Sequence, residues 1–258
     1  EFRRVLFRSS ITISPMLKVK RPAPRKDEKL ADETEKALTA EQLALLLDFV
    51  QSEPLQWRVY VHLSADTGAR KGELCGLQWS DVDWIAGTVT IRRNLQYTSE
   101  RRQELHYVTD KIYVTNTKTG KVRTVDLGES TLALLRQLKD SQRTVSLKDD
   151  WMFRQGNSTL PLFPQSPTRY FKMLGQRFNQ FCDDSGLPDM KIKNLHPHLL
   201  RHTVASLSVT GGADLRSTAD RLGHSEAVML RKYVHSTPES IRKSGQTARD
   251  QIAKASNE

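Results

Sequence analysis

Apolar residues recur at intervals of three and four along the first part of the chain, which predicts amphipathic helices there. Thr39, followed three residues later by Gln42, is the signature of a capping box, so a helix is expected to begin at this point. A second helix is predicted over Pro54–Gly68 and a short third one over Arg70–Leu77. The structured part of the chain is therefore expected to begin with helices.

The second half of the chain carries the same helical periodicity and predicts helices over residues 130–147, 167–185, 197–210, 214–222 and 227–233. Pro197 suits the first position of the third of these, because a helix start leaves that N–H unpaired anyway. Gly211 and Gly212 suit its end. His198 and Arg201 stand three residues apart in this helix, so we expect them to lie on one face.

The middle of the chain changes to a pattern rich in β-branched and aromatic residues. Strands are predicted over Thr88–Arg92, Val108–Asn116 and Val122–Leu127, and Thr119-Gly120 favours a turn between the last two. Strands do not alternate with helices, which argues against a doubly wound sheet. The predicted class is a mainly helical α+β domain, with a small antiparallel three-stranded sheet packed against a helical bundle.

The two ends of the chain lack these patterns. Residues 1–10 fit no element and are interpreted as a non-native leader. Residues 11–38 are rich in proline and lysine and predict an extended basic linker, either a solvated tail or a strap along a nucleic-acid backbone. Residues 238–258 form a polar tail. These boundaries leave 39–237 as the predicted catalytic domain, and a linker at the very start suggests a missing N-terminal domain.

Composition narrows the choice of partners. The net charge is +10, of which residues 1–30 contribute +6, so the rest of the chain is only mildly basic. This charge makes nucleic acid a plausible partner without establishing it. No apolar run approaches the roughly 18 residues of a membrane helix, and no secretory leader is recognised. Cys75 and Cys182 are interpreted as buried free thiols in a reducing cytoplasm.

Two groups of charged residues suggest a phosphate site. Arg70 follows a predicted helix end, and its guanidinium offers a planar fork of donors to phosphate oxygens; Glu73 could brace that fork. The alternative is an ordinary surface ion pair. Lys118, Lys121 and Arg123 lie at the predicted hairpin tip, from which a lysine could reach a ligand on the domain. The alternative there is a solubilising turn.

The C-terminal helices carry the remaining candidates. His198 and Arg201 place a proton donor beside a fixed cation, although they could also serve as a capping or core group and a structural ion-pair partner. His224 follows Gly223 in a predicted turn, and Tyr233 ends the next helix, where a tyrosine usually packs. Neither a Ser-His-Asp order nor a cluster of metal ligands accompanies them. Arginine and lysine would then neutralise the phosphate themselves, without a metal or another cofactor.

Five segments together resemble the tyrosine recombinases, the phage-type integrases, in that family's order and over residues 39 to about 237. They are Arg70-Lys-Gly-Glu73-Leu-Cys-Gly-Leu77-Gln-Trp79-Ser-Asp81-Val-Asp83, Lys118-Thr-Gly, His198-Leu-Leu-Arg201-His202-Thr203, Leu222-Gly223-His224-Ser225 and Tyr233-Val-His235. The joint occurrence of five motifs weakens each of the separate structural explanations.

The resemblance implies a role for each motif residue. Tyr233 would attack a DNA phosphate, leaving a 3′-phosphotyrosyl link and a free 5′-OH. Arg70 and Arg201 would clamp the nonbridging oxygens, and Lys118 would protonate the leaving 5′ oxygen. Because tyrosine is a weak nucleophile with a pKa of about 10, it needs the help of such neighbours.

His198 and His224 would assist proton transfer and phosphate binding, and Glu73 would support Arg70. Further DNA contacts are expected from Lys71, Lys121 and Arg123. We assign the remaining histidines near the motifs, His196, His202 and His235, to structure.

The resemblance implies site-specific recombination and integration of DNA, as in a mobile genetic element. Double-stranded DNA would be the substrate, with self-assembly to a tetramer on DNA and an excision or host accessory factor as a further partner. The protein would be cytoplasmic and nucleoid-associated when bound to DNA. The family's helical core-binding domain would precede this chain, and the tail 238–258 resembles its protomer-docking segment. The alternatives are type IB topoisomerase-like relaxation and a catalytically silent DNA-binding regulator.

Overall fold

The computed structural model describes residues 37–100, 105–118, 120–142 and 150–233, with the backbone alone for residues 231–233. These residues belong to one compact unit, Ala37–Glu258. The predicted leader 1–10, the linker up to residue 36 and the tail 238–258 lie outside them. The α-helices of the described part are α1 (Ala40–Phe49), α2 (Leu55–Thr67), α3 (Lys71–Cys75), α4 (Glu129–Ser141), α5 (Ser166–Asp184), α6 (Pro197–Thr210), α7 (Leu215–Leu222) and α8 (Glu226–Tyr233).

The helix ends follow the local chemistry of the sequence. The capping box before α1 is confirmed: the Gln42 backbone N–H donates to Thr39 Oγ1, and the Thr39 backbone N–H donates to Gln42 Oε1, both at 3.1 Å. Gly68 and Gly223 end α2 and α7 in the left-handed region, with φ of 57° and 64°. His196 caps α6, because its Nδ1 accepts from the Leu199 backbone N–H at 3.0 Å. Single-turn 3₁₀ helices occupy Val50–Ser52, Trp79–Asp81 and Pro188–Met190.

The strands form two antiparallel sheets of three. One has the order β1-β2-β6 and the other β3-β5-β4. Their bounds are β1 (Val82–Asp83), β2 (Thr88–Ile91), β3 (Arg93–Tyr97), β4 (His106–Tyr107), β5 (Ile112–Asn116) and β6 (Arg123–Asp126). Val89 faces Val125 in the first sheet, and Leu95 faces Val114 in the second. The predicted fold class, a mainly helical α+β domain with a small antiparallel sheet, is confirmed, although the strands form two three-stranded sheets where the sequence predicts one.

The predicted hairpin between the last two strands is wrong. β5 pairs with β3 and β4, whereas β6 pairs with β2, so the turn after Asn116 crosses from one sheet to the other. The prediction lacks β3, whose residues Arg93–Tyr97 are mostly polar and bury only Leu95. Because β3 supplies a partner for β5, β6 is left to extend the other sheet.

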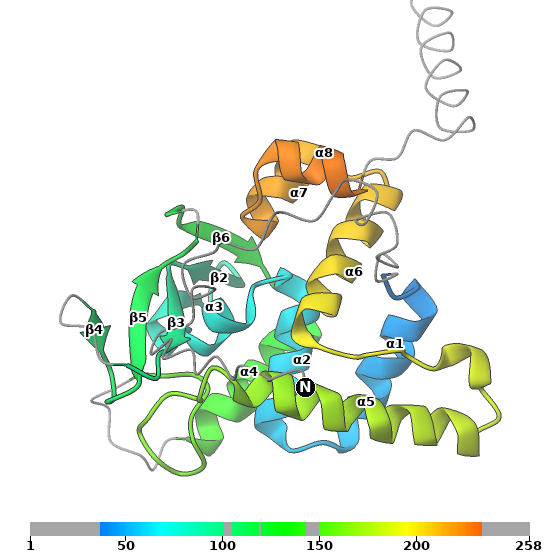
Figure 1. Cartoon of the computed structure of the whole chain (residues 1–258), viewed down its shortest axis with the longest axis horizontal. Helices are drawn as coiled ribbons and strands as arrows, with labels where there is room; N and C mark the ends of the chain where they lie inside the picture. Colours follow the sequence, from blue (N-terminus) through cyan, green and yellow to red (C-terminus); the bar gives the residue numbers. More distant parts are fainter. Residues whose placement is uncertain (1–36, 101–104, 119, 143–149, 234–258) are drawn as a thin grey trace, which may run out of the picture. The chain divides into compact units, whose positions relative to one another are not determined.

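The core has a main cluster and a smaller one. The main cluster joins α1–α6 and both sheets, and it includes the two thiols, Cys75 and Cys182, which are buried and free as predicted. The smaller cluster lies among the C-terminal helices. In Figure 1, α7 and α8 (orange) lie at one end of α6 (yellow), and α7 contacts β6. The C-terminal helices thus hold their own small core beside the first sheet.

Gly72 of α3 lies directly against β3. A Cβ at this position would be 2.2 Å from Asn94 Oδ1 and 2.6 Å from the Leu95 backbone oxygen, so no side chain fits without moving a strand. We expect Gly72→Ala to lower the free energy of unfolding by about 1–3 kcal/mol, as overpacking does. Urea unfolding followed by circular dichroism measures this change.

Gly128→Ala is the matched control, because its φ is −64° and a Cβ there would meet its nearest neighbour at 3.4 Å. That variant should unfold within about 0.5 kcal/mol of the wild type. Equal stability of Gly72→Ala and Gly128→Ala would contradict the close packing of α3 on β3.

Candidate active site

Three arginine side chains contact the C-terminal end of α7. A helix end leaves backbone carbonyls without partners and carries partial negative charge, so it suits cationic donors. Arg123 Nε donates to the Arg221 carbonyl at 2.9 Å, Arg201 Nη2 to the Leu222 carbonyl at 2.6 Å, and Arg70 Nη2 to the Gly223 carbonyl at 3.1 Å. We call Arg70, Arg123 and Arg201 the arginine cluster. Three consecutive carbonyls therefore fix three guanidinium groups from distant parts of the sequence.

Arg201 also ties the end of α7 to the end of α2. Its Nη1 donates to the Gly68 carbonyl at 2.7 Å, so the fork spans Gly68 and Leu222. A Cβ at Gly68 would lie 2.3 Å from Leu222 Cδ2, so the ends of α2 and α7 pack closely at this point. Arg201 is only 1% exposed, whereas the side chain of Arg70 is 22% exposed. The more accessible guanidinium of these two is thus that of Arg70.

The buried carboxylate of Glu73 joins two members of the arginine cluster. Its Oε1 is 2.8 Å from Arg70 Nη1, and its Oε2 is 2.5 Å from Arg123 Nη2. Oε2 also accepts the Arg70 backbone N–H at 2.9 Å. Burial by itself raises the pKa of Glu73, but the hydrogen bond and charge of Arg123, followed by those of Arg70, lower this pKa below its usual value. Glu73 is therefore an ionised brace between the two arginines.

Each histidine predicted at the site belongs to a segment that also contributes to this cluster. His198 is exposed, one turn before Arg201 on α6. His224 directly follows Gly223, and its Nδ1 lies 3.3 Å from Met229 Sδ. Met229 is fully buried in the smaller core cluster. His224 thereby contacts the helix that carries Tyr233, which is the last residue of α8; the side chain of Tyr233 lies outside the described residues.

The predicted lysines take no part in the contacts described above. Lys118 and Lys121 are exposed in the crossing between β5 and β6, where the Thr117 hydroxyl donates to the Lys121 carbonyl at 2.7 Å. Lys71 is exposed on α3, and its Nζ lies 3.2 Å from Thr168 Oγ1. The contacts of the described residues bring Arg70, Arg201, Glu73 and His224 together around the end of α7, and they do not link the three lysines to that point.

Arg123 requires a correction. As a residue of an exposed hairpin tip it was expected to contact DNA, but it is 9% exposed and is engaged by Glu73 and the Arg221 carbonyl. The alternation of β6 explains this position: Arg123 and Val125 face inward, whereas Thr124 and Asp126 face outward. The sequence of β6 shows the same alternation, but the predicted hairpin places Arg123 at an exposed tip and so misses its inward position.

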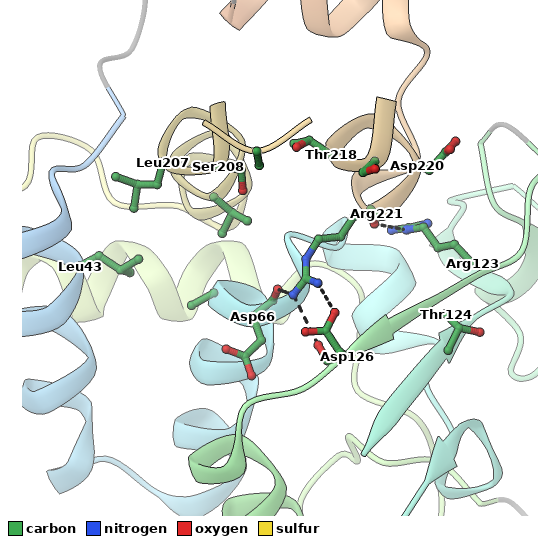
Figure 2. Close-up of a pocket in the computed structure, with 14 residues that line it drawn as sticks. Leu43, Asp66, Arg123, Thr124, Asp126, Leu207, Ser208, Thr218, Asp220 and Arg221 are labelled. Carbon is green, nitrogen blue, oxygen red and sulfur yellow. Dashed lines mark hydrogen bonds and ion pairs between the residues drawn. The ribbon is translucent and has the colours of Figure 1, made fainter. Parts of the chain in front are cut away.

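Arg221 is a positioning contact that the sequence reasoning lacks. Its Nη2 donates to the Asp66 backbone oxygen at 2.8 Å, and its Nη1 forms an ion pair with Asp126 (Figure 2). It thereby fastens the last turn of α7 to α2 and β6. These residues line a pocket of about 840 Å³ among α2, β6, α6 and α7. An arginine in the last turn of a predicted helix is a weak signal for such a contact, because it does not identify Asp126 as the partner.

Within the described ranges, no group of three His, Cys, Asp or Glu side chains is placed to hold a metal ion. In that same part of the chain, none of the helices is long and apolar enough to cross a membrane.

Comparisons with known proteins concern the family and the fold of the chain. Residues 36–240 match the model of the phage integrase family. The tyrosine recombinase XerC of Xanthomonas campestris pv. campestris (strain B100) is 26% identical over 228 residues, covering 87% of this chain and 57% of the relative. XerC of Xylella fastidiosa (strain 9a5c) is 26% identical over 235 residues, covering 88% of this chain and 63% of the relative. The chain thus spans about three-fifths of the length of these relatives.

Solved structures share the fold. The Tn1549 transposon integrase in complex with circular intermediate DNA superposes with a TM-score of 0.70 at 20% identity, covering 84% of this chain and 68% of that one. The crystal structure of the XerA recombinase gives a TM-score of 0.60 at 22% identity, covering 90% of this chain and 70% of that one. At these identities the likeness concerns the fold.

Proposed function

The chain belongs to the phage integrase family, and from this premise we propose that it cuts and rejoins DNA strands at specific sites, with Tyr233 as the nucleophile. The observation that carries the proposal is the pair of guanidinium groups, Arg70 and Arg201, held on the carbonyls of Gly223 and Leu222 directly before His224. Two preorganised cations suit the charge that develops on the oxygens of a phosphate during strand transfer.

In the proposed reaction, the Tyr233 oxygen forms a bond to phosphorus while the bond between phosphorus and the 5′ oxygen breaks. The phenolic proton passes to His198 or His224, and the departing 5′ oxygen takes a proton from Lys118. Arg70 and Arg201 hold the nonbridging oxygens. The phosphotyrosine ester keeps the energy of the broken bond, so a 5′-OH can attack it and rejoin the strands without ATP.

The burial of Arg201 adds a requirement to this proposal. Its guanidinium is 1% exposed and already serves two carbonyls, so a phosphate can bind it only after a local rearrangement exposes one edge. Arg70 is half-buried and offers the first contact. We therefore propose that DNA meets Arg70 first and that exposure of Arg201 follows.

The proposed partner is double-stranded DNA carrying recombination sites, at the nucleoid in the cytoplasm. Lys71, Lys118 and Lys121 are exposed and suited to contact the DNA backbone. We further propose that the catalytic unit covers 39–237, with 11–38 as its basic linker, that a core-binding domain precedes it in the whole protein, and that the tail 238–258 docks on a neighbouring protomer in a DNA-bound tetramer. An excision or host accessory factor would set the direction of the reaction.

Strand exchange between two sites distinguishes this proposal from its alternatives. The protein expressed from the complete gene is incubated with a supercoiled plasmid bearing two copies of the junction sequence that adjoins the gene. We expect recombinant circles in buffer containing EDTA and no relaxation of a plasmid that lacks the junctions. Relaxation of both plasmids without recombinants would indicate a topoisomerase, and binding without any strand cleavage would indicate a silent regulator.

A further inference from the structure

We propose that Arg123 is a positioning residue of this active site, which neutralises Glu73 and anchors the end of α7 so that the positive charge of Arg70 remains available for the phosphate. The inference rests on the proposed function and deepens it. Arg123 belongs to none of the five family-like motifs, and the sequence assigns it to the DNA-contacting surface.

The charge balance around Glu73 is the first argument. Without Arg123, the carboxylate of Glu73 would face Arg70 alone, and that pair would carry no net charge. Arg123 Nη2 at 2.5 Å from Oε2 supplies a second cation, so the three groups together keep one positive charge. An anionic substrate is attracted to that remaining charge, which acts strongly in a partly buried site.

The connection to α7 is the second argument. Arg123 Nε donates to the Arg221 carbonyl at 2.9 Å. The next two carbonyls, those of Leu222 and Gly223, accept from Arg201 and Arg70. The same guanidinium therefore contacts Glu73 on one side and the arginine-binding turn of α7 on the other. Loss of Arg123 should loosen the whole turn, because the partly buried Arg221 carbonyl and the buried Glu73 carboxylate would both lose a partner.

Gly223 gives the third argument. A Cβ at this position would lie 2.9 Å from Arg123 Nη1, so the absence of a side chain makes room for the guanidinium. Nη1 is buried and has no hydrogen-bond partner within the described residues. Arg123 is thus packed closely against the turn that precedes His224, where a small displacement changes the geometry of the site.

The test measures formation of the covalent protein–DNA complex at saturating DNA, with the junction DNA as substrate. Arg123→Gln should slow this step by about 10- to 100-fold, less than loss of a direct oxyanion donor, and change the DNA dissociation constant by less than about threefold. Arg123→Lys restores the charge without the fork, so its rate should lie between those of Arg123→Gln and the wild type. The control is Arg216→Gln, which changes an exposed α7 arginine whose Nε lies 3.5 Å from Glu226 Oε1, and it should react at the wild-type rate.

The pH profile separates positioning from general loss of structure. The charged groups that face Glu73 are Arg70 and Arg123. Removal of Arg123 raises the pKa of Glu73, because burial then acts against one cation only. Relative to the wild type, the rate of Arg123→Gln should therefore rise as the pH is lowered from 7 to 5, because a protonated Glu73 no longer offsets the charge of Arg70, and Glu73→Gln/Arg123→Gln should lack that step. A rate of Arg123→Gln within threefold of the wild type, or an unaltered pH profile, would overturn the proposal.

Hydrogen exchange tests the anchor independently of catalysis. In the DNA-free protein, the His224 backbone N–H donates to the Ala219 carbonyl at 2.8 Å. Mass spectrometry should show faster exchange over residues 221–228 in Arg123→Gln and unchanged exchange in Arg216→Gln. If the wild type forms no covalent complex with DNA, the proposed function is refuted. Hydrogen exchange still tests whether Arg123 anchors the end of α7. Equal exchange in Arg123→Gln and the wild type would overturn its anchoring role.

Discussion

Lysine in place of Arg201 should lower both the free energy of unfolding, by about 1–3 kcal/mol, and the rate of DNA cleavage, by about 100- to 1,000-fold. The guanidinium of Arg201 donates to the carbonyls of Gly68 and Leu222 through two nitrogens of one rigid fork. A lysine ammonium is a point charge on a flexible stem and cannot match this fork, so one buried carbonyl loses its partner. The same change replaces one of the two guanidinium forks that hold the phosphate oxygens with an ammonium, which cannot donate to two oxygens in the same fixed geometry.

Arg216→Lys on α7 is the matched control, since the side chain of Arg216 is 79% exposed. Urea unfolding measures stability, and trapping of cleaved DNA at saturating substrate measures the rate. Stability within about 0.5 kcal/mol of the wild type for Arg201→Lys would contradict the bridging role of the fork. Undiminished cleavage would contradict its catalytic role.

The helices are predictable because their signals are local. The capping box at Thr39, the glycines at positions 68 and 223, and Pro197 each act on the backbone within a few residues, and the structure has a helix end at each. The strand partners are less predictable, because pairing depends on residues distant in the sequence. β3 buries little and so gives a weak pattern, and its absence from the prediction produces the incorrect hairpin.

The site shows the same limit. Sequence motifs identify Arg70, Arg201 and His224, and the structure brings these residues together around the end of α7. Nothing in the motifs indicates that consecutive backbone carbonyls hold the arginines, because those contacts join segments up to 153 residues apart. The ion pair of Arg221 with Asp126 and the inward position of Arg123 depend on the same tertiary arrangement.

Tyr233→Phe should abolish cleavage altogether, the largest effect expected of any single substitution. Phenylalanine keeps the ring and lacks only the oxygen that forms the bond to phosphorus, so packing and DNA affinity should be nearly unchanged. Tyr170→Phe is the matched control, because Tyr170 lies on α5 and donates to Glu53 at 2.5 Å, away from the arginine cluster. That variant should cleave DNA like the wild type.

The most direct test of the central claim uses a nicked suicide substrate, in which the fragment released by cleavage diffuses away and the covalent complex accumulates. The wild type and Tyr170→Phe should form a denaturant-resistant protein–DNA complex with a free 5′-OH on the released fragment, and peptide mapping should locate the DNA on Tyr233. Tyr233→Phe should form none. A complex of equal yield in Tyr233→Phe, or DNA attached to another residue, would contradict the assignment of Tyr233 as the nucleophile.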